Sequence, residues 1–356
     1  MSRAARRPRI RTYLLGGVLL MSSLSAAGHA TAATDARQAT AVPVARQATA
    51  AGARPGPALA DDGAYISRVE PLDERVLDLT VESPAMRGGM PVRVILPRHW
   101  REEPNSTFPV VYLLQGASDD YTSWTRETDI EELAADTDVL VVMPEGGRAG
   151  FYTDWWDHGR STAPRWETFH TGELRQLVER AFRGDGTRAV IGLSEGGLGA
   201  LNYAARHPNS YRFVGSLSGV VDTSDPVMRF GIAVTCLREH VDPERLWGQP
   251  DAQRRIWDAH NPTRMVSRFR NTWVYLYAGT GVPGGLEQGF DLAASLLEKP
   301  LGPSTYAFAR DLRRSDVKVT TDLFKPGTHA WPYWQRELHR MWPSVLSALG
   351  AGASEH

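Results

Sequence analysis

The sequence predicts an α/β protein with a mainly parallel central sheet covered by helices on both faces. Short continuous apolar runs alternate with amphipathic segments, and runs that are buried on both faces are typical of parallel strands. The runs cover residues 110–114, 139–143, 189–193, 213–217 and 273–277. The candidate helices cover residues 127–135, 172–182, 197–206, 290–297 and 333–349. Two paired antiparallel strands, 76–81 and 92–96, precede this alternation, and a last strand, 317–324, precedes the final helix.

A serine turn follows the central strand. Val190 and Ile191 lead into Gly192-Leu-Ser194-Glu-Gly196, and a helix-forming stretch then runs to His207-Pro208. In this Gly-x-Ser-x-Gly pattern, a sharp strand-to-helix turn lifts the serine oxygen above the sheet. Glycines flank the serine because side chains there would collide with the neighbouring strand and helix. The pattern in this place indicates the α/β-hydrolase fold and predicts Ser194 as a nucleophile.

A nucleophilic serine needs a base, and chain order in this fold puts the base after the last strand. Of the ten histidines, His329 is the one in the loop between strand 317–324 and the final helix. A carboxylate should orient its imidazole and follow strand 273–277. That leaves Glu287, Asp291 and Glu298, with Asp222 as an outside alternative. The residues alone do not separate these candidates.

Two backbone N–H groups should hold the oxyanion that forms on the substrate carbonyl. One is expected from Glu195, the residue after the serine, and the other from the loop that follows strand 110–114. This loop begins Gln115-Gly116-Ala117. Because Gly116 lets the backbone approach closely, the N–H of Ala117 is the predicted second donor.

The N-terminal residues read as an export signal and a leader. Arginines precede a short apolar core, 13–20, and small residues follow, which predicts a cleaved signal over 1–32 and an extracellular protein. Residues 33–60 lack hydrophobic periodicity and predict a disordered leader, followed by one catalytic domain over 61–350 and a tail over 351–356. The repeated Ala-Arg-Gln-Ala-Thr-Ala presents Gln38 and Gln47 as transglutaminase acyl-donor sites, against a removable spacer as the alternative.

Composition excludes several classes of protein. The single cysteine, Cys236, rules out a disulfide within the chain. Removing the five arginines of residues 1–32 changes the net charge from −1 to −6, and removing the three arginines and one aspartate of residues 33–60 changes it to −8. An acidic domain without a basic stripe argues against nucleic-acid binding. With no Cys/His cluster at zinc spacing, neither a metal nor another cofactor is predicted.

From about residue 92 to residue 349, the chain resembles the antigen 85 family of secreted mycolyltransferases and their esterase-like relatives. Separated blocks in the same order carry the resemblance: Tyr112–Gly116, Val142–Gly147, Phe151–Trp155, Trp166–Phe169, Gly192–Gly197, Ser216–Gly219, Leu246–Gly248, Asn261–Thr263, Val274–Tyr277, Gly327–Trp331 and Tyr333-Trp334. The resemblance implies Ser194 as nucleophile, His329 as base and Glu298 as acid. It leaves cell-wall association open.

The chain departs from the family on the sugar side of the site. Members that use trehalose have an aspartate where Gln115 stands, and an arginine in a loop that is here two residues shorter, around Ser118. A family asparagine falls near Glu127. Gln115, Ser118 and Trp331 are the predicted substrate-binding side chains, and trehalose specificity is not expected.

The predicted function is that of an exported serine esterase or acyltransferase. An acyl group, from a donor ester of lipid type, would be held on Ser194 and passed to water or an alcohol. A trehalose mycolyltransferase of the antigen 85 type is the first alternative. A surface binding protein on an inactive hydrolase scaffold is the second, because fold does not fix function.

Overall fold

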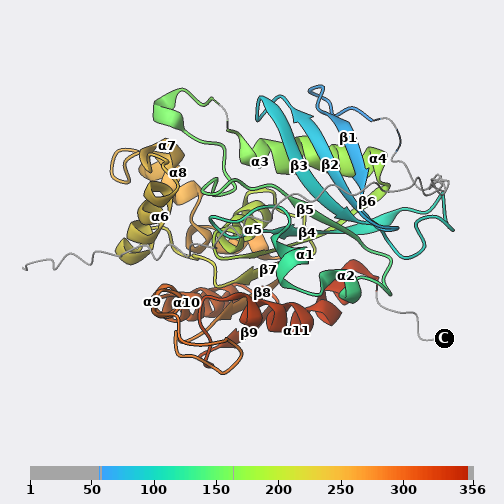
Figure 1. Ribbon diagram of the computed structural model, residues 1–356. Helices are drawn as coiled ribbons and strands as arrows, with labels where there is room; N and C mark the ends of the chain where they lie inside the picture. Colours follow the sequence, from blue (N-terminus) through green and yellow to red (C-terminus); the bar gives the residue numbers. More distant parts are fainter. Residues whose placement is uncertain (1–55, 57, 163, 352–356) are drawn as a thin grey trace, which may run out of the picture. The chain divides into compact units, whose positions relative to one another are not determined.

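The computed structural model describes residues 56, 58–162 and 164–351 (Figure 1). The predicted signal and most of the predicted leader, with Gln38 and Gln47, lie outside the described residues, so those assignments stay predictions. Leu59 pairs with Tyr65 in an isolated bridge and Ala60 is buried, so the folded part begins slightly before residue 61. Among the described residues, no helix combines the length and apolarity that crossing a membrane requires.

The described strands form one nine-stranded sheet in the order β1-β2-β3-β5-β4-β6-β7-β8-β9. Their bounds are β1 (Tyr65–Pro71), β2 (Val76–Ser83), β3 (Gly88–Ile95), β4 (Phe108–Leu114), β5 (Leu140–Pro144), β6 (Gly184–Leu193), β7 (Phe213–Leu217), β8 (Trp273–Ala278) and β9 (Val319–Leu323). Pairing is antiparallel from β1 through β3 to β5 and parallel from β5 to β9. The predicted fold class is therefore confirmed. The edge strand β1 was not predicted, because most of its side chains are exposed and it lacks an apolar run.

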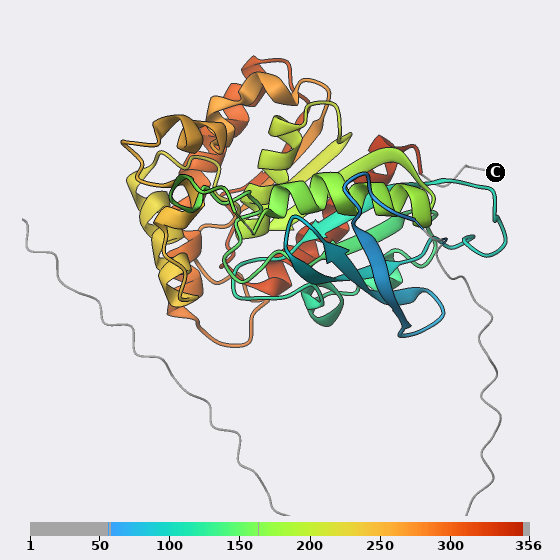
Figure 2. The same ribbon diagram turned by 90° about the horizontal axis from the view of Figure 1, so that it is seen from above.

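Helices cover both faces of this sheet. They are α1 (Ser123–Glu127), α2 (Ile130–Leu133), η1 (Asp157–Gly159), α3 (Trp166–Thr168), η2 (Phe169–Leu174), α4 (Arg175–Ala181), α5 (Glu195–Arg206), α6 (Pro226–Arg238), α7 (Glu244–Trp247), α8 (Arg254–Ala259), η3 (Pro262–Arg264), η4 (Val266–Phe269), α9 (Leu292–Glu298), α10 (Leu301–Arg314) and α11 (Trp331–Leu349). Alternate residues of β4 pack into two clusters: Val110 and Tyr112 join α4, α5 and α10, while Val111 and Leu113 join α2 and α11. Figure 2 shows the light-green α3–α4 segment lying across the strands on one face.

Two helix predictions were wrong in detail. The predicted helix 127–135 is split into α1 and α2, because Thr128 between them has an extended backbone and its hydroxyl donates to the carbonyl of Trp124. The predicted helix 172–182 begins earlier, at Trp166, and passes through the π-helical η2 before α4. Two long helices, α6 and α10, were not predicted. On α6 several apolar side chains face outward, which obscures the amphipathic pattern.

Candidate active site

Ser194 lies on the turn between β6 and α5, as the sequence predicts. Its backbone has φ 53° and ψ −117°, a conformation that a non-glycine residue adopts at a cost and keeps only where the surroundings enforce it. The Ser194 N–H donates to the carbonyl of Leu217 on β7 (2.8 Å). A Cβ at Gly192 would collide with the carbonyl of Gly196, and a Cβ at Gly196 would collide with the carbonyls of β4. Close packing of backbone on backbone therefore fixes the turn.

Three predicted side chains meet at this turn. The Ser194 Oγ lies 2.8 Å from His329 Nε2, and His329 Nδ1 lies 2.8 Å from Glu298 Oε2. Glu298 stands at the end of α9 with 0% exposure, and His329 lies in the loop between β9 and α11. The second oxygen of Glu298 accepts from the Ser218 hydroxyl (2.8 Å) and the Gly279 N–H (2.6 Å). Serine, histidine and glutamate form one continuous hydrogen-bonded chain.

The other candidate carboxylates are occupied elsewhere. Asp291 caps α9 by accepting from the N–H groups of Ala293 and Ala294. Glu287 accepts from Thr328 and Tyr333. Asp222 accepts from Ser224 and Asn261. These partners leave Glu298 as the carboxylate that contacts the imidazole.

Two supporting side chains were not predicted. Ser218, which follows β7, has φ 52° and donates to Glu298. The Trp334 indole donates to the Ser218 hydroxyl (3.0 Å) and stands edge-on to His329, with ring centroids 5.0 Å apart. Both residues lie in blocks that carried the family resemblance. The resemblance marked these positions but did not indicate that they support Glu298 and His329.

The loop after β4 lies against the serine turn. A Cβ on Gly116 would come within 2.7 Å of Leu193 Cδ1, so a side chain at this position would require Leu193 to shift. The next residues form a turn in which Ser118 has φ 65° and donates its N–H to the carbonyl of Arg148 (2.8 Å). The hydrogen bonds of the described backbone leave the N–H groups of Ala117 and Glu195 without an acceptor.

The predicted substrate-binding side chains have structural partners. Gln115 is only 1% exposed, and its amide nitrogen donates to the Asp119 carbonyl (2.7 Å) and to Glu145 (3.3 Å). The Gln115 side chain is therefore largely engaged within its own loop, and its part in substrate binding stays a prediction. The Ser118 hydroxyl contacts Arg238 and Glu239 next to α6. Trp331 remains partly exposed and stands edge-on to Trp124 and Trp334, with centroids 5.4 Å apart in each pair.

Comparisons with known proteins identify the family of this chain. Residues 83–345 match the family described as "Putative esterase". The diacylglycerol acyltransferase/mycolyltransferase Ag85B of Mycobacterium leprae is 33% identical over 256 residues, which are 68% of this chain and 77% of that protein. The chain belongs to the antigen 85 family. The solved structure of MPT51 (FbpC1) of Mycobacterium tuberculosis has a TM-score of 0.64 at 25% identity and covers 80% of this chain and 99% of its own. An S-formylglutathione hydrolase from Agrobacterium tumefaciens shares the fold, with a TM-score of 0.62 at 18% identity over 80% of this chain and 99% of its own.

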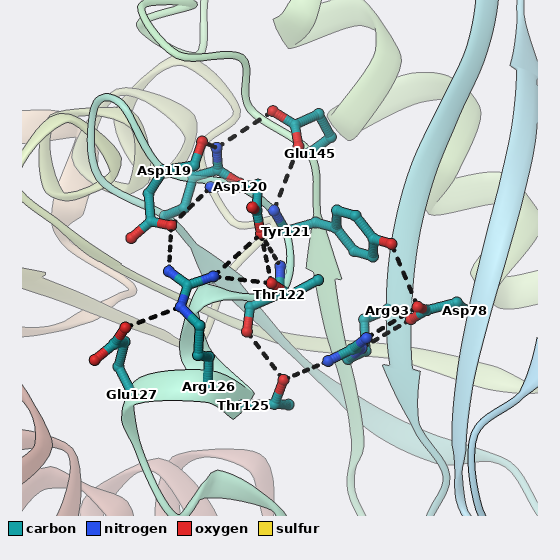
Figure 3. A network of polar contacts seen from close by, with 11 residues as sticks. Asp78, Arg93, Asp119, Asp120, Tyr121, Thr122, Thr125, Arg126, Glu127 and Glu145 are labelled. Carbon is teal, nitrogen blue, oxygen red and sulfur yellow. Dashed lines mark hydrogen bonds and ion pairs between the residues drawn. The ribbon is translucent and has the colours of Figure 1, made fainter. Parts of the chain in front are cut away.

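Within this antigen 85 protein, the loop after β4 is held by a dense polar network (Figure 3). Arg126 of α1 contacts Asp119 (2.6 Å), Asp120 (3.6 Å) and Glu127 (2.9 Å). The side chain of Glu145 receives the N–H of Tyr121 (3.3 Å). Glu127, near which a family asparagine falls, is therefore paired with an arginine of its own helix.

Proposed function

We propose that this protein is a serine-dependent esterase or acyltransferase that works through an acyl-Ser194 intermediate. The continuous chain from Ser194 through His329 to Glu298, with both links at 2.8 Å, is the observation that carries the proposal. A short, aligned contact between nucleophile and base is the geometry that proton transfer needs.

The first half of the reaction forms the acyl-enzyme. His329 Nε2 takes the proton of Ser194 as Oγ attacks the ester carbonyl, and the carbonyl oxygen becomes an oxyanion held by the N–H groups of Ala117 and Glu195. The bond to the leaving alcohol then breaks, and His329 returns the proton to that alcohol. Glu298 stabilises the imidazolium in between, and its bonds to Ser218 and Gly279 fix its position.

The second half releases the acyl group. Water or an alcohol attacks the acyl carbonyl while His329 removes its proton, and Ser194 is regenerated when the proton returns to Oγ. Hydrolysis and transfer use the same side chains and differ only in the acceptor that reaches the acyl-enzyme first.

A lipid-type acyl chain is supported by exposed apolar side chains beside the site. The outer face of α6 carries Val227, Phe230, Val234 and Leu237. The α9 helix, which carries Glu298, exposes Leu292, Leu296 and Leu297, and Phe290 precedes it. Met228 of α6 and Leu301, the first residue of α10, share one cluster, so α6 packs against the start of α10, which follows α9 in the chain. Exposed apolar surface of this kind marks a binding region, and part of it lies on the helix that carries Glu298.

Two observations bear on trehalose as acceptor. Named relatives are mycolyltransferases, which keeps a trehalose mycolyltransferase as the second candidate. Against it, Gln115 and Ser118 carry no charge, Gln115 is buried and the Ser118 hydroxyl contacts Arg238 and Glu239, so neither offers a charged group to a sugar. We also propose that the protein is exported, on the basis of the predicted signal over residues 1–32.

A panel of p-nitrophenyl esters of increasing chain length tests the proposal directly. We expect turnover that rises with chain length and a fluorophosphonate adduct on Ser194. A protein that neither cleaves these esters nor takes the label would instead fit the binding-protein alternative. Repeating the assay with trehalose, and analysing the products for trehalose esters, separates the two enzymatic candidates.

A further inference from the structure

The residue after the nucleophile carries a buried carboxyl group. Glu195 is 5% exposed, and one of its oxygens accepts from the Phe151 N–H (2.7 Å). The other oxygen has no hydrogen-bond partner among the described residues. Burial raises the pKa of Glu195 to about 8, so the group is neutral at pH 7. The triad mechanism uses the backbone of Glu195 and gives this side chain no role.

The partner of this carboxyl group belongs to a strained segment. Phe151 and Tyr152 both have φ 52°, in the left-handed region that residues with side chains rarely adopt. The Tyr152 ring lies so close to Gly199 of α5 that a Cβ there would collide with it. The hydrogen bond from Phe151 to Glu195 therefore helps to hold a backbone conformation that is unfavourable by itself.

The same segment reaches the other side of the oxyanion site. The Tyr152 hydroxyl donates to the carbonyl of Gln115 (2.9 Å), two residues before Ala117. Burial raises the pKa of Tyr152 well above its ordinary value, so this hydroxyl keeps its proton when the pH rises. A hydrogen-bonded path thus runs from the Glu195 carboxyl through Phe151 and Tyr152 to the loop that carries the second donor.

We propose that the Glu195 side chain is a positioning residue that couples the two oxyanion donors, one on its own backbone and one on Ala117. The inference rests on the proposed acyl-transfer function and adds to it a control of that site by pH. In its neutral form the carboxyl group accepts from Phe151 and places no charge near the donors. After ionisation it places a negative charge on the residue whose own N–H is proposed to hold the oxyanion, so the two negative charges repel each other.

The direction of the pH effect follows from the surroundings of Glu195. The groups that face it are Tyr152, Glu145 just after β5, Cys236 and Arg238 of α6, and Glu239 just after α6. Arg238 is the one cation among them, and it also contacts Glu239. Below pH 8 Glu195 is neutral and the site is competent. Activity should fall as the pH rises through about 8, because the ionised form repels the oxyanion.

The decisive variant is Glu195→Gln, which keeps an oxygen for the Phe151 N–H and cannot ionise. Kcat for a p-nitrophenyl ester would be measured from about pH 6 to about pH 9.5, with a Ser194→Ala blank subtracted for spontaneous hydrolysis. Each profile is normalised to its own maximum. We expect the parent to lose activity about tenfold or more on the alkaline side, and the variant to keep its activity to a pH at least about one unit higher.

Glu173→Gln is the matched control, because Glu173 is also a buried carboxyl group with a raised pKa but bonds to Ser83 and Ala85, away from the serine turn. Its profile should follow that of the parent. The inference would be overturned if the pH profiles of the parent and Glu195→Gln coincided. It would also be overturned if Glu173→Gln kept its activity to the same higher pH as Glu195→Gln. A parent that cleaves no ester at any pH would instead overturn the proposed function.

Tyr152→Phe tests the second link in the path. Removing the hydroxyl leaves the Gln115 carbonyl without this donor and weakens one of the contacts that position the loop carrying Ala117. We expect kcat to fall about tenfold while KM changes little, since oxyanion contacts act in the transition state. A loss of thermal stability with unchanged kcat would mean that the hydroxyl is only structural, and the coupling would be refuted.

Discussion

The serine turn and the loop after β4 lie side by side, yet they are held in place in different ways. The turn, 192–197, is fixed by backbone packing on backbone, with glycines where no side chain fits. The loop, 115–121, is fixed by polar side chains, including Gln115, Glu145 and Arg126. Steric exclusion allows few substitutions, whereas a polar network can be rebuilt with other partners. We therefore expect substitutions to be tolerated more readily in the loop than in the turn.

The largest effect is expected at the serine itself. Ser194→Ala should abolish ester turnover and fluorophosphonate labelling while thermal unfolding stays close to that of the parent, because a smaller side chain fits the turn. Residual catalysis should not exceed about 10³- to 10⁴-fold over the uncatalysed reaction, from the oxyanion donors and binding alone. Near-parental turnover would show that Ser194 is not the nucleophile, and the turn would then have no catalytic role.

The next largest effect should come from the carboxylate. Glu298→Gln should lower kcat by about three to four orders of magnitude with little change in KM, because the charge acts on the imidazolium of the transition state. Asp291→Asn is the matched control: it removes a charge from the same helix but keeps an oxygen for the cap, so its effect should be mild. Steady-state kinetics on one ester measure both. A larger loss in the Asp291 variant would refute the assignment of Glu298.

A pair of substitutions compares the backbone packing that fixes the turn with the polar contacts that fix the loop. Gly196→Ala puts a Cβ against the carbonyls of Leu114 and Gln115, so we expect destabilisation by about 2 kcal/mol or more and loss of labelling. Arg126→Ala removes a half-exposed ion pair with Asp119 and should change the free energy of unfolding by about 1 kcal/mol or less, with labelling kept. Urea unfolding and probe labelling give both results. Equal effects would show that the two regions are not supported differently.

The smallest effect is expected from trehalose. It should neither compete with water as acceptor nor raise the thermal midpoint, because a buried Gln115 and a Ser118 bound to α6 supply no charged partner. Charge-assisted hydrogen bonds of this kind contribute about 1.5–3 kcal/mol each. Trehalose esters among the products, or ordered trehalose beside Ser194 in a crystal, would show that the rebuilt loop still accepts the sugar.

Several features could be predicted because they depend on local sequence. The strand 213–217 has the predicted bounds, and the Gly-x-Ser-x-Gly turn has the predicted geometry. An apolar run buried on both faces and a turn that excludes side chains leave a pattern within a few residues. The break at Thr128 and the outward apolar face of α6 left no such pattern, so the helices there were misjudged or missed.

The sequence by itself determined the fold class, and it predicted Ser194 as the nucleophile and His329 as the base, because chain order and local sterics specify such positions. Chain order left four carboxylates open and the family resemblance pointed to Glu298; the tertiary structure brings Glu298 to His329, buries Gln115 and links Glu195 to the loop through Phe151 and Tyr152. Glu298 and His329 are 31 residues apart, and Ser194 and His329 are 135 apart. Contacts over such separations depend on how strands and helices pack, and no local pattern records that packing.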